Sequence, residues 1–204
     1  NRETRATASA SSNRIADAPS VSGTWKREAG GWRFYSNSGV MQKGFCYISG
    51  KKYYFGPSDG LMKTGWQKVG RYYYYLGSAD DGSVKTGWQN IGGSWYYFQI
   101  NGVMSYGMVD VGSSVYYFGS SSDGAMKTGW QVIYDLYYYF GGANDGAMKT
   151  GWYKENGTWY YLDQSGIMKT GWFKVGKYWY YAYGSGALAV STTTPDGYRV
   201  NGNG

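Results

Sequence analysis

Large apolar side chains recur along the chain every 20 to 22 residues, and each of them except the first directly follows a glycine. We call this large residue position 0 of a repeat and count the other positions from it. Position 0 is occupied by Trp25, Phe45, Trp66, Trp88, Met108, Trp130, Trp152 and Trp172. A period near 20 residues is typical of solenoids, in which each repeat is one supersecondary unit.

Each repeat is predicted to form two short strands joined by a tight turn. Position +9 is always aromatic, and position +8 is Tyr in every repeat except the first, which has Arg33. Aromatic runs bounded by glycine-containing turns indicate β-hairpins. Because side chains alternate along a strand, +7 and +9 face one way and +8 and +10 the other. We assign +8 and +10, for example Tyr53 and Phe55, to the core between repeats. The predicted fold is therefore all-β, a repetitive solenoid of stacked β-hairpins.

The composition changes along the chain and divides it into three parts. Residues 1–22 have no aromatic side chain and are expected to form a flexible linker or leader. Residues 23–190 hold about eight hairpin repeats, and residues 191–204 are a degenerate closing segment.

Position +7 varies together with position 0. Where position 0 is Trp, +7 is Trp or Tyr, but where it is Phe45 or Met108, +7 is Lys52 or Val115. A joint loss of the Trp at 0 and of the ring at +7 within single repeats is what a two-ring binding site would show. The alternative is that the two rings only pack against each other.

The composition excludes several classes of function. The 204 residues include 25 Tyr, 10 Trp and 7 Phe, no His and one Cys. No Ser-His-Asp or Cys-His nucleophile and no His/Cys zinc site can therefore be built. The acids are three Glu and ten Asp, and five of the Asp stand in Asp-Gly turns, so no glycosidase carboxylate pair is expected either. We expect no enzyme activity, no metal and no cofactor.

The charge and hydropathy of the chain limit the partners and the location that are expected for it. A net charge of +7 favours a polyanionic partner, either nucleic acid or an anionic wall polymer. Nucleic acid is disfavoured because the positive charge is sparse relative to the aromatic residues. No apolar run approaches the ~18 residues of a membrane span.

The string Met-Lys-Thr-Gly-Trp, followed after five or six residues by Trp-Tyr-Tyr, resembles the choline-binding (cell-wall-binding) repeat of pneumococcal and related Gram-positive surface proteins. The resemblance covers residues 23–190. It implies a left-handed β-superhelix in which choline lies between consecutive repeats. Two aromatic side chains of each cage come from one repeat and a third from the next, often with a Met nearby. Choline is the head group of the phosphocholine on teichoic and lipoteichoic acids.

The resemblance implies specific cages. The third ring in each is expected from position +9 of the next repeat, and the implied sets are Trp25, Trp32 and Tyr54; Trp66, Tyr73 and Tyr97; Trp88, Trp95 and Tyr117; Trp130, Tyr137 and Tyr161; and Trp152, Trp159 and Tyr181. Trp172 and Trp179 have no clear partner, because Tyr198 lies one frame off. The repeats at Phe45 and Met108 are expected to bind choline poorly. Four methionines either line the cages or pack between repeats: Met62, Met104, Met126 and Met148.

The function implied is a non-catalytic, secreted module that binds phosphocholine-bearing teichoic and lipoteichoic acids and so attaches a surface protein to the cell wall. Two alternatives remain open: a glucan- or oligosaccharide-binding module, and the wall-targeting part of a larger cell-wall hydrolase. Members of this family often dimerise through terminal repeats, so a homodimer is a further expectation. A ladder of recurring lysines either meets teichoic phosphates or is a solvated surface: Lys63, Lys85, Lys127, Lys149 and Lys169.

Overall fold

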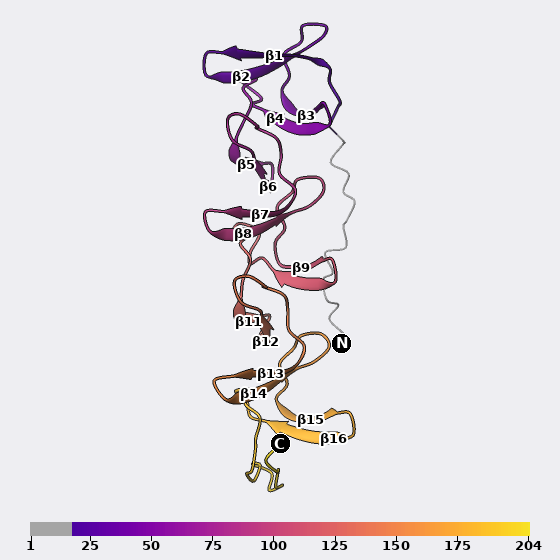
Figure 1. Ribbon diagram of the computed structural model, residues 1–204, viewed down its shortest axis with the longest axis vertical. Helices are drawn as coiled ribbons and strands as arrows, with labels where there is room; N and C mark the ends of the chain where they lie inside the picture. Colours follow the sequence, from indigo (N-terminus) through magenta and orange to yellow (C-terminus); the bar gives the residue numbers. More distant parts are fainter. Residues whose placement is uncertain (1–17) are drawn as a thin grey trace. The chain divides into compact units, whose positions relative to one another are not determined.

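The computed structural model describes residues 18–204, and every helix or strand in this part of the chain is a β-strand. Each odd-numbered strand pairs antiparallel with the strand that follows it, as Figure 1 shows. The strands are β1 (Gly23–Glu28), β2 (Gly31–Ser36), β3 (Gly44–Ile48), β4 (Lys51–Phe55), β5 (Gly65–Val69), β6 (Tyr72–Leu76), β7 (Gly87–Ile91), β8 (Ser94–Phe98), β9 (Met108–Val111), β10 (Ser114–Tyr117), β11 (Gly129–Ile133), β12 (Leu136–Phe140), β13 (Gly151–Glu155), β14 (Thr158–Leu162), β15 (Gly171–Val175) and β16 (Tyr178–Ala182). The prediction of an all-β array of successive hairpins is confirmed.

The chain divides into two compact units, which we describe separately. The first contains the hairpins from β1 to β8 together with Phe118–Ala125. The second contains Met108–Tyr117 and the chain from Met126 onward, with the hairpins from β9 to β16.

Tight two-residue turns set the pairing within each hairpin. Both central residues have positive φ in the turns Ser49–Gly50, Gly92–Gly93, Tyr134–Asp135 and Asn156–Gly157. Positive φ at both positions is the type I′ geometry, whose twist matches that of the two flanking strands. The glycine before each position 0 from Phe45 onward also has positive φ, for example 79° at Gly151. A side chain there would be strained, which explains why Gly recurs before the large residue.

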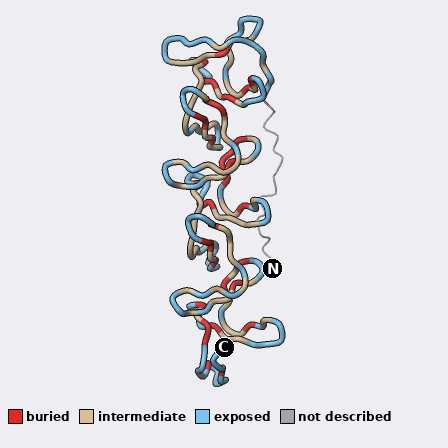
Figure 2. The backbone as a smooth tube through the Cα atoms, in the orientation of Figure 1, coloured by how far each residue is buried: buried red, intermediate tan, exposed pale blue. Residues whose placement is uncertain are grey.

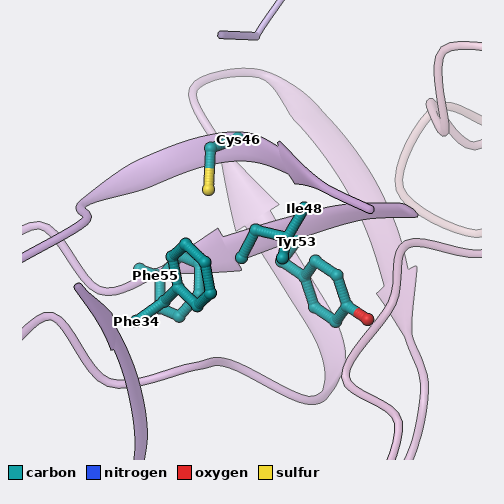
Figure 3. Packing of buried hydrophobic residues seen from close by; sticks show 5 residues of the cluster. All are labelled: Phe34, Cys46, Ile48, Tyr53 and Phe55. Carbon is teal, nitrogen blue, oxygen red and sulfur yellow. The ribbon is translucent and has the colours of Figure 1, made fainter. Parts of the chain in front are cut away.

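The +10 side chains form the core of the array. From the second repeat onward they are at most 1% exposed: Phe55, Leu76, Phe98, Phe118, Phe140, Leu162 and Ala182. Figure 2 shows the buried segments along the strands and the exposed ones at the hairpin tips. In one cluster Phe34 of β2 packs with Cys46, Ile48, Tyr53 and Phe55 of the next hairpin, as Figure 3 shows. A lone hairpin is marginal in water, so this packing between hairpins supplies the stability.

Backbone hydrogen bonds also connect consecutive repeats. The N–H of the residue at −4 donates to the +7 carbonyl of an earlier hairpin, as from Met62 to Trp32 at 2.7 Å and from Leu188 to Trp159 at 2.9 Å. Each Met then packs closely on a loop glycine with positive φ. A Cβ on Gly186, for example, would lie 2.2 Å from the Met168 sulfur. The methionines therefore pack between repeats, which is one of the two roles expected of them.

The first described residues are paired with β3. Val21 N–H donates to the Tyr47 carbonyl, and Tyr47 N–H donates to the Pro19 carbonyl, both at 2.8 Å. This end of the predicted leader is thus attached to the array, while residues 1–17 lie outside the described part. Among residues 18–204 there is no helix long and apolar enough to cross a membrane.

Candidate cation-binding sites

The hairpin pairing brings three predicted site positions onto one face. Position 0 lies directly across from +9 of its own hairpin, and +2 lies across from +7. In β13–β14, for example, Trp152 pairs with Tyr161 and Lys154 pairs with Trp159. Residues directly across an antiparallel pair have side chains on the same face of the sheet. Positions 0, +7 and +9 therefore share a face, as the strand alternation predicts.

The clearest site is formed by β13–β14 and the next hairpin. The Trp152 and Trp159 ring centroids are 6.2 Å apart with an interplanar angle of 85°. The Tyr180 ring of β16 lies 4.8 Å from Trp152 at 70°. These three rings and Leu188 line a hollow of roughly 320 Å³, with Gly202 and Asn203 on its rim. Three steeply inclined rings thus form a corner that is large enough for a small organic cation.

The same arrangement recurs at other repeats. Ring contacts join Trp25 to Trp32 at 6.4 Å and Trp88 to Trp95 at 6.3 Å. In the other Trp-containing repeats, position 0 contacts the +9 ring of its own hairpin: Trp66 with Tyr75 at 5.3 Å, Trp130 with Tyr139 at 5.2 Å and Trp172 with Tyr181 at 5.3 Å.

The third ring differs from the prediction. It comes from +8 of the next hairpin, and the observed pairs are Trp25 with Tyr53, Trp66 with Tyr96, Trp130 with Tyr160 and Trp152 with Tyr180, at 4.8–5.1 Å. The +9 rings pack instead within their own hairpins: Tyr54 on Phe45, Tyr97 on Trp88, Tyr161 on Trp152 and Tyr181 on Trp172. Tyr117 belongs to the second unit, where it contacts Phe140.

The reason for the difference is the alternation of side chains along a strand. A +9 ring faces the same way as its own position 0, so +8 is the ring that points to the preceding hairpin. One signal in the sequence distinguishes the two positions. In this sequence the first repeat follows no other repeat, and it keeps an aromatic at +9 (Phe34) but has Arg33 at +8. Arg33 instead donates hydrogen bonds to Glu28 at 2.7 Å and to the Asp59 carbonyl at 2.9 Å.

The closing segment completes the surroundings of the last Trp. Tyr198 lies 5.7 Å from Trp172 with an interplanar angle of 88°. The Trp172 indole N–H donates to Asp196 at 2.7 Å, and Thr194 donates to the other oxygen of that carboxylate at 2.6 Å. These two hydrogen bonds lower the pKa of Asp196. Tyr198, which the sequence places one frame off, is thus the ring that meets Trp172.

A carboxylate also contacts the indole of Trp130. Its N–H donates to Glu155 at 2.9 Å, and the Tyr153 hydroxyl donates to the other oxygen of Glu155 at 3.2 Å. Burial, followed by hydrogen bonds involving Tyr139 and Glu155, raises the pKa of Tyr153. The Tyr139 and Tyr153 rings stack at 4.0 Å. A carboxylate that accepts a hydrogen bond from an indole N–H makes the ring face more attractive to a cation.

The recurring lysines after the methionines are largely neutralised within the chain. Lys63 forms an ion pair with Asp59 at 2.9 Å, and Lys169 forms one with Asp163 at 3.3 Å. Lys85 pairs with Asp81 and Lys149 with Asp145 in the same way. Hydrogen bonds from these lysines lower the pKa of three carboxyl groups: Asp59, Asp81 and Asp145. Four of the five ladder lysines are thus paired with loop aspartates, three of which stand in Asp-Gly loops.

Other lysines lie on the rings of the sites. The Lys154 ammonium is 5.3 Å from the centroid of Trp159, and the Lys68 ammonium is 5.3 Å from that of Tyr73. Both lysines are at +2, directly across from the +7 ring. They place positive charge at the edge of the sites.

Comparison with known families agrees with this geometry. The choline-binding repeat profile matches residues 85–128, 127–168 and 149–192, which is more than half of the chain. A profile for a cell-wall-binding repeat matches residues 43–62. The chain therefore belongs to the choline-binding repeat family, and the predicted membership is confirmed. Comparison with curated protein sequences returns no match.

Solved structures give the same result. CbpJ from Streptococcus pneumoniae is similar with 40% identity and a TM-score of 0.80, over 85% of this chain and 61% of CbpJ. Choline binding protein F from S. pneumoniae, solved in the presence of a peptidoglycan analogue, has 41% identity and a TM-score of 0.76, over 85% of this chain and 60% of that protein. The choline-binding domain of CbpL from S. pneumoniae has 28% identity and a TM-score of 0.64, over 90% of this chain and 96% of that domain. The chain thus spans about 60% of the length of the first two relatives. It is a choline-binding repeat module of the kind found in pneumococcal surface proteins, which associate with the cell wall.

Proposed function

We propose that this chain is a non-catalytic, secreted module that holds a protein on the Gram-positive cell wall by binding phosphocholine on teichoic and lipoteichoic acids. The observation that supports this most directly is the corner formed by Trp152, Trp159 and Tyr180, with its hollow of roughly 320 Å³. The proposed function needs no cofactor, because side chains of the chain itself supply the proposed contacts to the ligand.

Cation–π attraction gives each site a modest affinity. A quaternary ammonium has no N–H to donate, so the negative faces of aromatic rings are well suited to it, at ~0.5–2 kcal/mol per contact. Three rings correspond to roughly millimolar binding, since 1 mM is equivalent to about −4 kcal/mol. Several such sites on one repetitive polymer raise the overall affinity by about 10²–10⁴. A repeat array is therefore suited to a polymer that displays the same head group many times.

The phosphate of phosphocholine has candidate partners in the +2 lysines. Lys68 and Lys154 place an ammonium beside the +7 rings of two sites, whereas the ladder lysines are paired with Asp side chains. An ammonium at this distance attracts a phosphate attached to the bound choline. This distribution of charge favours phosphocholine over free choline at the sites of Trp66 and Trp152.

The test uses an amine resin and a calorimeter. With its net charge of +7, the chain should be repelled by a tertiary-amine resin unless the rings bind the amine. We expect retention, elution by free choline but not by equimolar NaCl, and calorimetric saturation with about one choline for each Trp at position 0. Failure of choline to elute the protein or to raise its melting temperature would contradict the proposal.

The glucan-binding and enzymatic alternatives are tested with the same protein. Dextran binding without choline binding would favour an open sugar platform over a cation cage. Release of fragments from purified cell wall by this chain alone would contradict the non-catalytic assignment. Sedimentation with and without choline tests the expected homodimer.

A further inference from the structure

Lys52 stands where the Trp-containing repeats have a ring. It is at +7 of the β3–β4 hairpin, whose position 0 is Phe45. The sequence pattern alone describes this repeat as one that has lost the Trp at position 0 and the ring at +7. The position of the Lys52 side chain shows a different arrangement.

The Lys52 ammonium lies against two aromatic rings. Its nitrogen is 4.7 Å from the centroid of Phe45 and 5.9 Å from that of Tyr74. Tyr74 is at +8 of the next hairpin and lies 4.8 Å from Phe45. Phe45 and Tyr74 are therefore the counterparts of Trp152 and Tyr180, which also lie 4.8 Å apart. The ammonium contacts the same pair of ring positions that lines the hollow at Trp152.

A backbone carbonyl is a further partner of this ammonium. Lys52 donates a hydrogen bond to the Asn101 carbonyl at 2.9 Å, across 49 positions of sequence. A primary ammonium has three N–H donors, so it needs an acceptor that a quaternary ammonium does not need. The loop that contains Asn101 supplies this acceptor. The hydrogen bond therefore connects the β3–β4 hairpin to the fourth repeat.

The neighbouring hollow does not reach these rings. A hollow of roughly 380 Å³ lies beside Lys52 and is lined by Val84, the residue at the Met position, and by Asn101. Neither Phe45 nor Tyr74 lines it, whereas both Trp152 and Tyr180 line their hollow. Tyr74 is only 2% exposed. A ligand entering this hollow would meet the lysine before it met the rings.

We propose that Lys52 is a built-in occupant of the second site: its ammonium takes the place of the ligand cation and closes the site to external amines. The contacts of this one side chain join the β3–β4 hairpin, the β5–β6 hairpin and the Asn101 loop without any ligand. The proposal rests on the proposed function, because it treats the ring pair as a cation site. It adds a residue that sets which repeats accept ligand.

The chain contains its own local probe for a test. Cys46, its single cysteine, is 1% exposed, lies on β3 directly across from Tyr53, and is packed in the cluster of Figure 3. Its reaction with a thiol reagent therefore requires local opening of the hairpin that contains Lys52. The experiment measures this rate in Lys52→Ala, with Lys51→Ala as the matched control. Lys51 is the neighbouring residue on β4, and its side chain is 64% exposed.

We expect Cys46 to react about tenfold faster in Lys52→Ala than in the native protein, and at the native rate in Lys51→Ala. Tetramethylammonium should slow the reaction of Lys52→Ala by more than it slows that of Lys51→Ala, because only the first variant has a vacant ring pair. Lys52→Met, which keeps the chain length without the charge, should also react faster than the native protein.

Three results would overturn the proposal. These are a native rate in Lys52→Ala, a native rate in Lys52→Met, and a fast rate in Lys52→Ala that tetramethylammonium does not reduce beyond the control. Calorimetry with choline on the native protein distinguishes failure of this proposal from failure of the proposed function. If the native chain binds no choline, the proposed function fails, while the thiol rates still decide the role of Lys52.

Discussion

The sites at Trp152 and at Phe45 have the same backbone but different contents. In both, position 0 lies across from an aromatic +9, and +8 of the next hairpin lies 4.8 Å from position 0. At Trp152 the +7 residue is the ring of Trp159, and a hollow remains between the rings. At Phe45 the +7 residue is Lys52, and its ammonium covers the rings.

This difference separates two roles that the repeat combines. The hairpin, its turn and its +10 residue form the scaffold, which is the same in both places. In the proposed function, the residues at 0 and +7 decide whether a repeat binds an external cation or holds its own. The array can therefore lose a ligand site without losing the packing on which its neighbours depend.

The largest expected effect tests whether the scaffold is shared. Phe55 and Leu162 are the +10 residues of the two hairpins, and both are 0% exposed. Phe55→Ala should lower the free energy of unfolding by about 3–5 kcal/mol and Leu162→Ala by about 2–5 kcal/mol, since each leaves a cavity in a packed core. Urea unfolding measures both changes. Ile100→Ala, at a residue that is 94% exposed, is the control and should change little. A small effect at only one of the two core positions would show that the hairpins are not equivalent.

The next effect concerns ligand number. Trp152→Ala removes the central ring of its site, so calorimetry with choline should count one bound molecule fewer than in the native chain. Phe45→Ala should leave the count unchanged, because Lys52 already closes that site. Tyr134→Ala is a control at a hairpin tip, since Tyr134 is 94% exposed. Equal losses of choline from Trp152→Ala and Phe45→Ala would remove the distinction between the two sites.

A smaller effect tests the origin of the third ring. Tyr180→Leu should weaken choline binding at Trp152 by roughly 2–30-fold, the equivalent of one cation–π contact of ~0.5–2 kcal/mol. Tyr181→Leu should leave Trp152 unaffected and should perturb Trp172, against which Tyr181 packs. The NMR signals of the two indole N–H groups, followed during a choline titration, distinguish these results. Weaker binding at Trp152 in Tyr181→Leu alone would favour the +9 ring as the third member.

The sequence predicts the scaffold better than the sites. The hairpins follow from the repeat length of about 20 residues, and the buried +10 row follows from the alternation of side chains along a strand. Both can be read within a single repeat. The third ring depends on which face of one hairpin turns toward another, and the register within a single repeat does not contain that information. Lys52 illustrates a second limit. The pattern shows that a ring is missing, but only the side-chain position shows that an ammonium lies against the remaining rings.

The smallest expected effect distinguishes the last site from that of Trp66 by its acid dependence. The pKa of Asp196 is lowered from 3.8, mainly by hydrogen bonds from Thr194 and Trp172. A carboxyl group with a lowered folded-state pKa stabilises the fold at pH values above its unfolded pKa, and this contribution is lost as the pH falls through the folded value. The closing segment should therefore stay attached to Trp172 at neutral pH and loosen only below about pH 4. The indole N–H signal of Trp172 should shift with a midpoint below 3.8, and Asp196→Asn should abolish this transition. The Trp66 signal is the internal control, because Gly202 and Asn203 of the closing segment also line the hollow at Trp152. A transition of Trp66 with the same midpoint would show that the acid effect is not local to Asp196.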